Sequence, residues 1–158
     1  MNELDQLYQQ VIMDHARERH GQGTLAAADA ESFQVNPTCG DEATVRVKLG
    51  HDGATPVLEG LAWDGHGCQI SQASMSVMYD LTHGQPVSEV ERLGELFREM
   101  MHSRGSFPEE RLDDLEDGAA FLGASKLSAR VKCALLGWMA LRAALAEALT
   151  SEPTGGMS

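Results

Sequence analysis

Apolar residues recur at helical intervals at the start of the chain and then alternate with polar residues, which predicts one helix followed by strands. The helical pattern covers residues 2 to about 20. Residues 43–49 alternate apolar and polar side chains, the period of a half-buried strand. The sequence His-Asp-Gly at 51–53 predicts a turn before a second strand near 57–63. Phe33 and Val35 suggest a third, short strand before the Asn-Pro step.

The rest of the chain is dominated by helical spacing. Broad apolar faces predict helices over residues 70–81 and 86–101, and shorter helical turns over 112–122. A long helix is expected from Ser128, a suitable N-cap, to about residue 149. One helix, a small antiparallel sheet and then several helices indicate an α+β fold. We expect a single domain over residues 1–150 and a disordered tail over 151–158.

The composition narrows the classes of partner. Acidic residues outnumber basic ones 24 to 12, giving a formal charge of −12. Such a surface repels phosphate backbones, so nucleic-acid binding is not expected. The acidic surface serves solubility, or alternatively docks a basic protein partner. The acidic start of the chain is unlike a signal peptide, and no apolar run reaches the roughly 20 residues that span a bilayer. We therefore expect no membrane association and a cytoplasmic location.

The three cysteines are far apart in the sequence, so only the fold could bring them together. No Cys-x-x-Cys pair is present, and a cytosolic chain is kept reduced, which argues against a disulfide framework. Cys39 lies between Pro37 and Gly40, and Asp41 follows two residues later. A thiolate beside a carboxylate is unfavourable unless a cation lies between them. The alternative is a buried cysteine with a turn-forming aspartate.

The other two cysteines also have neighbours that favour a thiolate. Cys68 follows Gly-His-Gly at 65–67 and precedes a predicted helix, whose N-terminus favours negative charge. Cys133 follows the cations Arg130 and Lys132. Taken alone, each could also be a small core residue, an alternative that is stronger for Cys133, which lies inside a helix. Three thiolates and one carboxylate suit tetrahedral zinc, although soft thiolates could also hold an iron–sulfur cluster.

Three motifs in order resemble the IscU-like family, and most closely its SufU branch. They are Asn-Pro-Thr-Cys-Gly-Asp at 36–41, Gly-His-Gly-Cys-Gln-Ile-Ser at 65–71 and Arg-Val-Lys-Cys-Ala-Leu-Leu-x-Trp at 130–138. Lys132 stands where a histidine usually precedes the last cysteine of IscU proteins. The chain also has an extra segment at about 84–108, and SufU proteins carry a comparable insertion.

The resemblance implies an α+β fold and a Zn²⁺ site formed by Cys39, Asp41, Cys68 and Cys133. It implies that Cys39 accepts sulfane sulfur from a SufS-type cysteine desulfurase, whose histidine replaces Cys39 on zinc. Arg130 would be a supporting residue of this reaction. Downstream iron–sulfur assembly proteins would be the other partners. The chain would thus act as a sulfurtransferase-like sulfur acceptor and activator of the desulfurase.

Two alternatives use the same four residues. The chain could be a scaffold that binds iron and assembles a nascent iron–sulfur cluster for transfer, or a plain module stabilised by structural zinc. His66, beside the second motif, could in principle ligate a metal, but an exposed loop histidine is the preferred interpretation. The other five histidines have no ligand-like spacing from the cysteines and are expected to be surface or core residues.

Overall fold

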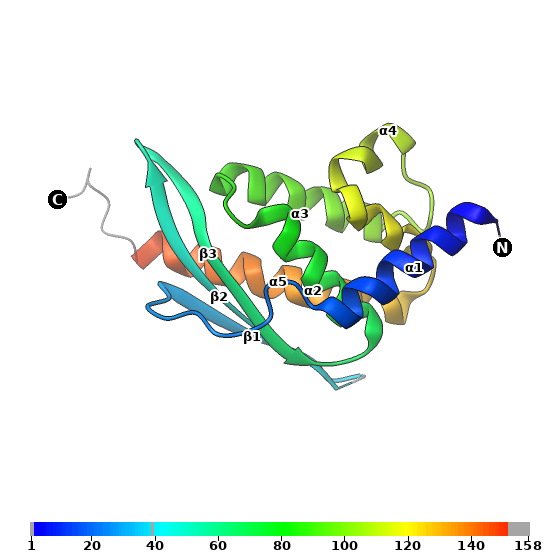
Figure 1. Ribbon diagram of the computed structural model, residues 1–158, viewed down its shortest axis with the longest axis horizontal. Helices are drawn as coiled ribbons and strands as arrows, with labels where there is room; N and C mark the ends of the chain where they lie inside the picture. Colours follow the sequence, from blue (N-terminus) through cyan, green and yellow to red (C-terminus); the bar gives the residue numbers. More distant parts are fainter. Residues whose placement is uncertain (1, 39, 152–158) are drawn as a thin grey trace.

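A computed structural model describes residues 2–38 and 40–151 and has an α+β architecture (Figure 1). In chain order the elements are α1 (Glu3–Glu18), β1 (Ala30–Asn36), β2 (Asp41–Asp52), β3 (Thr55–His66), α2 (Gln69–Thr82), α3 (Val87–Met101), α4 (Glu109–Leu112), the 3₁₀ helix η1 (Asp113–Lys126) and α5 (Ser128–Ser151). The strands form an antiparallel sheet in the order β1-β2-β3. The predicted fold class and all three strands are confirmed. Of the predicted tail, Ser151 belongs to α5, and 152–158 lie outside the described residues.

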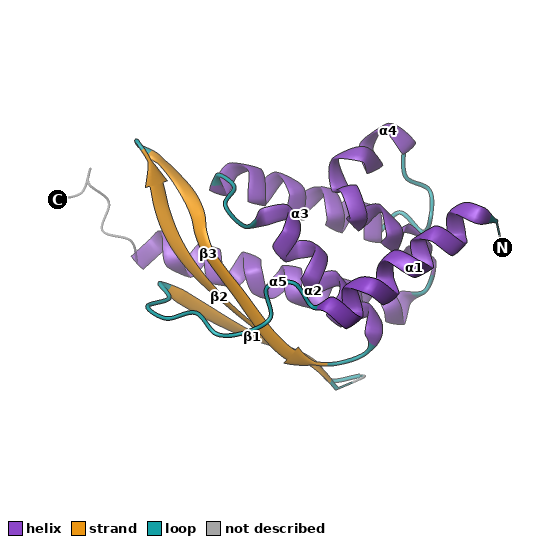
Figure 2. Cartoon of the chain, viewed as in Figure 1, coloured by secondary structure: helices purple, strands orange, loops and turns teal. Residues whose placement is uncertain are grey.

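One face of the sheet forms part of the core. Along β2, Ala43, Val45 and Val47 are fully buried, whereas the residues between them are half-buried. Val45 pairs with Trp63 of β3, which is also fully buried. This alternation places every second side chain against the helices, as the period of two in the sequence predicts. Figure 2 shows the strands along one side of the molecule and the helices gathered beside them.

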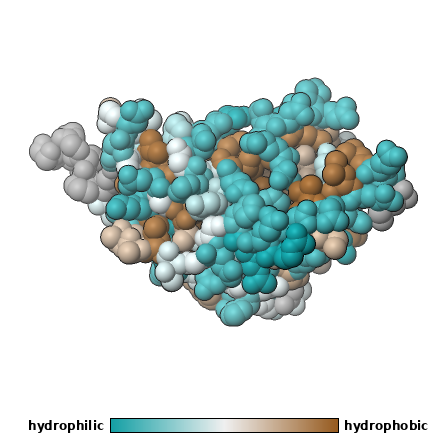
Figure 3. Space-filling view, in the orientation of Figure 1, coloured by the Kyte–Doolittle hydropathy of each residue, from teal (hydrophilic) through white to brown (hydrophobic). Residues whose placement is uncertain are grey.

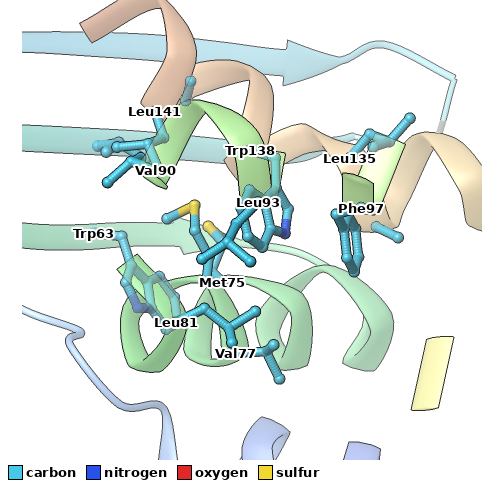
Figure 4. Close-up of a cluster of buried hydrophobic side chains, with 14 of the residues drawn as sticks. Trp63, Met75, Val77, Leu81, Val90, Leu93, Phe97, Leu135, Trp138 and Leu141 are labelled. Atoms are coloured by element: carbon cyan, nitrogen blue, oxygen red, sulfur yellow. The ribbon is translucent and has the colours of Figure 1, made fainter. Parts of the chain in front are cut away.

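The helix α3 is part of this core. It lies in the segment 84–108, which the resemblance marks as an insertion, and its buried face consists of Val87, Val90, Leu93, Leu96, Phe97, Met100 and Met101. Phe97 stacks on Trp138 of α5 with ring centroids 4.8 Å apart. Figure 4 shows these rings in one cluster with Trp63 and Met75. The segment therefore carries core side chains and cannot be removed without opening the interior.

The last helix, α5, is long and apolar enough to cross a membrane by length and composition alone. In its most apolar stretch 61% is buried, because α5 packs against β1, β2 and α2. We interpret it as a core helix. The face of the protein seen in Figure 3 is largely hydrophilic, as the net charge of −12 leads one to expect.

Two details differ from the sequence-based expectation. The helix α1 ends at Glu18, before the expected end near residue 20, because Arg19 adopts a left-handed conformation with φ of 50°. In the loop that follows, Gly21 permits a close approach, since a Cβ there would overlap the ring of Tyr79. Ser128 is the first residue of α5 rather than its cap.

Candidate metal centre

Three separate elements bring Asp41, Cys68 and Cys133 together. Asp41 begins β2, Cys68 directly precedes α2, and Cys133 lies near the start of α5. The pairing of Glu42 with His66 brings the start of β2 beside the segment that leads into α2. As a result, one donor atom from each of the three residues lies within 4.8 Å of the other two. The fold therefore confirms that Asp41 and two of the three cysteines converge.

The contact between Asp41 and Cys68 has the spacing of two metal ligands. Asp41 is only 3% exposed, and its Oδ1 accepts the Cys68 N–H at 3.2 Å. Its Oδ2 lies 3.4 Å from the Cys68 Sγ. Neighbouring donors of a tetrahedral zinc with ordinary Zn–S and Zn–O distances stand roughly 3.5–3.8 Å apart. With the Asp41 Oδ2 and the Cys68 Sγ 3.4 Å apart and a donor atom of Cys133 within 4.8 Å of the other two, two thiols and a buried carboxylate fit zinc in donor chemistry.

Gly67 makes this approach possible. A Cβ at Gly67 would overlap the Ser71 Oγ and would lie only 2.8 Å from the carboxyl carbon of Asp41. Ser71 is itself fully buried and donates a hydrogen bond to the Cys68 carbonyl at 3.0 Å. Any side chain at 67 would therefore push Asp41 or Ser71 away from Cys68. Gly67 therefore serves close packing around Cys68, whereas Gly65 allows close approach to the backbone of Glu42 in β2.

A cavity of about 460 Å³ opens beside the two thiols. Its lining comes from the end of β1 and the loop after it, from the start of α2 and from the start of α5: Asn36, Thr38, Cys68, Gln69, Ile70, Ser128, Ala129, Arg130, Lys132 and Cys133. Cys68 is exposed and occupies the N-cap position of α2. Cys133 is only 6% exposed. The predicted cations Arg130 and Lys132 thus lie at the site together with both thiols.

Two residues considered as metal ligands, Cys39 and His66, are not among the three converging donors. Cys39 lies outside the described residues, although its neighbours Asn36 and Thr38 line the cavity. Its membership of the ligand set therefore stays a prediction. His66 is exposed at the end of β3 and is not part of the converging donor group in the described part of the chain. This agrees with its interpretation as a surface residue.

A second cluster of polar side chains, around His15 and His20, was not predicted from the sequence. The His15 Nδ1 lies 2.7 Å from the Ser76 Oγ, and its Nε2 lies 2.8 Å from the Asp117 Oδ2. The His20 Nδ1 lies 2.7 Å from the Asp80 Oδ2. His15, His20 and Asp80 also have donor atoms within 4.8 Å of one another. The partners are about 60 to 100 residues away, so no local motif could indicate them.

Comparison with known proteins assigns the family. Residues 7–151 match the family described as the NifU-like N-terminal domain. The chain belongs to this family. It is 36% identical over 144 residues to the zinc-dependent sulfurtransferase SufU of Bacillus subtilis, covering 91% of this chain and 92% of that protein. It is 34% identical over 145 residues to the iron–sulfur cluster assembly scaffold protein IscU of Streptococcus pyogenes, covering 92% and 86%.

A solved structure supports the same placement of this NifU-like chain. It is the crystal structure of an iron–sulfur cluster assembly scaffold protein for the SUF system from Fervidobacterium islandicum AW-1. The TM-score is 0.70 at 31% identity, with 85% of this chain and 93% of that chain covered. The resemblance to the IscU-like family and its SufU branch, inferred from three motifs, is therefore confirmed.

Proposed function

We propose that this protein serves iron–sulfur cluster assembly by carrying sulfur on Cys39 beside a zinc ion held by Cys39, Asp41, Cys68 and Cys133. The observation that carries the proposal is the convergence of Asp41, Cys68 and Cys133 within 4.8 Å. The similarity to a Bacillus subtilis protein named as a zinc-dependent sulfurtransferase supports the choice of metal and cargo. The sulfur donor would be a SufS-type cysteine desulfurase in the cytoplasm, and downstream iron–sulfur assembly proteins would receive the cargo.

The protein's own residues hold and orient the donors. When bound, zinc would keep the thiols deprotonated at neutral pH. Asp41 is fixed by the Cys68 N–H on its Oδ1, which leaves Oδ2 directed at the thiol side of the site. Such hydrogen bonds to a ligand hold it in orientation and raise metal affinity. Three thiolates and one carboxylate around Zn²⁺ carry a formal charge of −2, and Arg130 and Lys132 are placed to offset it.

Sulfur loading is a thiol–disulfide type of exchange. The Cys39 thiolate attacks the outer sulfur of a persulfide on the desulfurase cysteine, forming a new S–S bond. The S–S bond of the donor breaks, and the desulfurase cysteine leaves as a thiolate, so no external oxidant or reductant is required. Arg130, at the cavity beside Cys68 and Cys133, would stabilise the negative charge on the transferred sulfur.

The second candidate function is a scaffold for a nascent iron–sulfur cluster. The Streptococcus pyogenes relative is named as such a scaffold, and the Fervidobacterium structure is described in the same terms. The thiols of Cys68 and Cys133 suit iron as well as zinc. Exposure of Cys68 at an open cavity is compatible with cluster release. This alternative shares the donor set but differs in the metal that is retained during purification.

Metal analysis combined with a desulfurase assay tests the proposal. We expect about one zinc per chain after aerobic purification. We also expect faster alanine formation from cysteine when the protein is added to a SufS-type desulfurase. A Cys39→Ala variant should lose sulfur acceptance, measured as the mass of one added sulfur atom, whereas the neighbouring control Thr38→Ser should retain it. An iron–sulfur cluster after anaerobic reconstitution, without desulfurase stimulation, would favour the scaffold. Normal loading of Cys39→Ala would exclude Cys39 as the acceptor.

A further inference from the structure

The helix α2 is enclosed by other elements, and its fully buried hydroxyls form two kinds of hydrogen bond. Ser71 and Thr82 donate to carbonyls three and four residues before them, at 3.0 and 2.7 Å. Serines and threonines in helices commonly form such local bonds. Ser74 instead donates to the Ala134 carbonyl of α5 at 2.6 Å, and Ala134 is also fully buried. The Ser74 hydroxyl therefore joins two helices.

Stability alone is a weak reason for a serine at position 74. In an α-helix such as α5 the carbonyl of residue 134 also accepts the backbone N–H of residue 138, so it does not depend on Ser74 for a partner. Replacing a buried serine by alanine, with no polar atom left unpaired, costs little. A hydrogen bond is directional, however, whereas apolar contacts are non-directional and permit sliding. The Ser74 bond thus determines where α2 stands along α5.

A second contact brings the same two helices close together. Gly137 of α5 faces Met75 of α2, and a Cβ at Gly137 would overlap the Met75 Cγ. Met75 is fully buried and follows Ser74 directly, so its side chain has no open space into which it could move. Residues 134 and 137 are three positions apart and share a face of α5. The hydrogen bond and the close contact therefore act on the same interface between α2 and α5.

This interface leads to the two thiols that converge in the metal centre. Cys133 is adjacent to Ala134 and four residues before Gly137, which places it on the same side of α5. Cys68 caps α2 six residues before Ser74 (74 − 68), or about 9 Å along a helix that rises 1.5 Å per residue. Metal–ligand distances in a well-formed site vary by only about 0.2 Å, so even a small slide of one helix along the other disturbs the pair of thiols.

We propose that Ser74 and Gly137 are positioning residues of the metal centre, which fix α2 against α5 so that the two converging thiols stand at the separation of two zinc ligands. This inference deepens the function proposed above and rests on it for the identity of the metal. Neither residue belongs to the converging donor group itself. Ser74 acts through Ala134 and the first turns of α5, and Gly137 acts by letting the backbone of α5 approach α2.

Zinc affinity, measured by competition with a chelator of known affinity, tests the hydrogen bond. Ser74→Ala should bind zinc roughly tenfold more weakly than the wild type, as is usual when a residue that orients metal ligands is removed. Thr82→Val is the matched control, because it removes an equally buried hydroxyl of α2 whose bond stays within that helix. It should bind zinc as the wild type does. Wild-type affinity in Ser74→Ala, or an equal loss in both variants, overturns the proposal for Ser74.

A cobalt spectrum separates positioning from a general loss of stability. In Co²⁺-substituted protein the visible absorption bands report the geometry of the ligands. We expect Ser74→Ala to shift these bands and Thr82→Val to leave them unchanged. Gly137→Ala should also shift them, because the added Cβ pushes α5 away from Met75. The double variant Gly137→Ala/Met75→Ala, which removes the overlapping atoms, should return towards the wild-type spectrum. Unshifted bands in Gly137→Ala, or no return in the double variant, overturn the proposal for Gly137.

Bridging of the two thiols tests the inference without any metal. In a Cys39→Ala background only Cys68 and Cys133 remain, and dibromobimane becomes fluorescent when it links two nearby thiols. Ser74→Ala should lower the rate of linking severalfold, relative to the labelling of single thiols by monobromobimane, and Thr82→Val should not. Equal rates overturn the inference. A wild-type protein that binds no zinc would overturn the proposed function, and the linking rates would still decide whether Ser74 positions the thiols.

Discussion

Within residues 2–38 and 40–151, two clusters of donor side chains are compact enough to hold a metal ion, and they differ in how many of their polar atoms already have hydrogen-bond partners. One consists of Asp41, Cys68 and Cys133, and the other of His15, His20 and Asp80. In each, the donor atoms lie within 4.8 Å of one another. Proximity alone therefore does not distinguish a metal site from a structural network. The hydrogen bonds of each donor do.

In the cysteine cluster, the Cys68 thiol has only long contacts in the described structure. Its Sγ lies 3.4 Å from the Asp41 Oδ2 and 4.0 Å from the Ser71 Oγ. Both thiols also line the cavity of about 460 Å³, so a ligand can reach them. The Cys68 thiol, with these contacts and beside an open space, is accessible for coordination.

In the histidine cluster, all four ring nitrogens already lie at hydrogen-bond distance from a partner. Those of His15 face Ser76 and Asp117, and those of His20 face Asp80 and Glu18 at 2.7 and 2.9 Å. A separation of 2.7 Å between the His20 Nδ1 and the Asp80 Oδ2 is a hydrogen bond and is too short for two ligands of one metal ion. This cluster fastens α1 to α2 and η1.

The Ser76, His15 and Asp117 side chains are connected in the order of a nucleophilic triad, but they are not placed for catalysis. Ser76 is fully buried, so a substrate cannot reach its hydroxyl. Its Oγ also accepts the backbone N–H of His20 at 2.9 Å. A hydroxyl used in this way stabilises the fold.

The largest expected contrast between the clusters is in metal retention. Cys133→Ala should reduce zinc from about one ion per chain to less than about a tenth, because a structural zinc site depends on all its ligands. His20→Ala should leave the zinc content unchanged. Metal content measured by mass spectrometry after gel filtration checks both. Zinc loss in His20→Ala with the fold intact would show that the histidine cluster binds metal.

The next contrast is in stability. His15→Ala should lower the free energy of unfolding by about 2–4 kcal/mol, because it empties a buried position and leaves the buried Ser76 hydroxyl without its ring partner. Asp117→Asn is the matched control, since its side chain is 60% exposed and can be solvated, and it should cost less than about 1 kcal/mol. Urea unfolding with zinc present measures both. An unchanged midpoint for His15→Ala would contradict a structural role for the cluster.

Much of the fold could be predicted because its elements have local signals. The apolar residues that alternate at 43–49, and those that form one face of α2, α3 and α5, are the ones that the fold buries. The ends of helices were predicted less accurately where tertiary contacts determine them. The helix α1 stops at Arg19, and Gly21 is required by the neighbouring Tyr79 ring, a residue 58 positions later in the chain (79 − 21). Such a contact has no local pattern.

The candidate site was predictable in a different way. Its cysteines are far apart, and only short motifs with glycine, a helix start or nearby cations pointed to each. In the structure these neighbouring residues lie at the site: Gly67 packs against Asp41, and Arg130 and Lys132 line the cavity. The histidine cluster had no such motif, because His15 and His20 find their partners on other elements. Spacing predicts a site only when the chemistry lies within a few residues.

The smallest expected effect concerns the pH dependence that His20 adds. Its hydrogen bond to Asp80, and then that to Glu18, raises the pKa of His20 above its ordinary value of 6.5. A raised pKa in the folded state means that the stabilisation is complete below pH 6.5 and is lost as pH rises through the folded pKa.

His20→Gln should therefore cost more stability near pH 6 than near pH 9, by less than about 1 kcal/mol because the side chain is 37% exposed. His102→Gln is the control and should show no such difference, because His102 is exposed and its side chain makes no ion pair with the described residues. The zinc site contributes equally to wild type and variant, so it cancels in the comparison. A difference that grows toward pH 9 would mean that His20 is held neutral, and would contradict charged hydrogen bonds from His20 to Asp80 and Glu18.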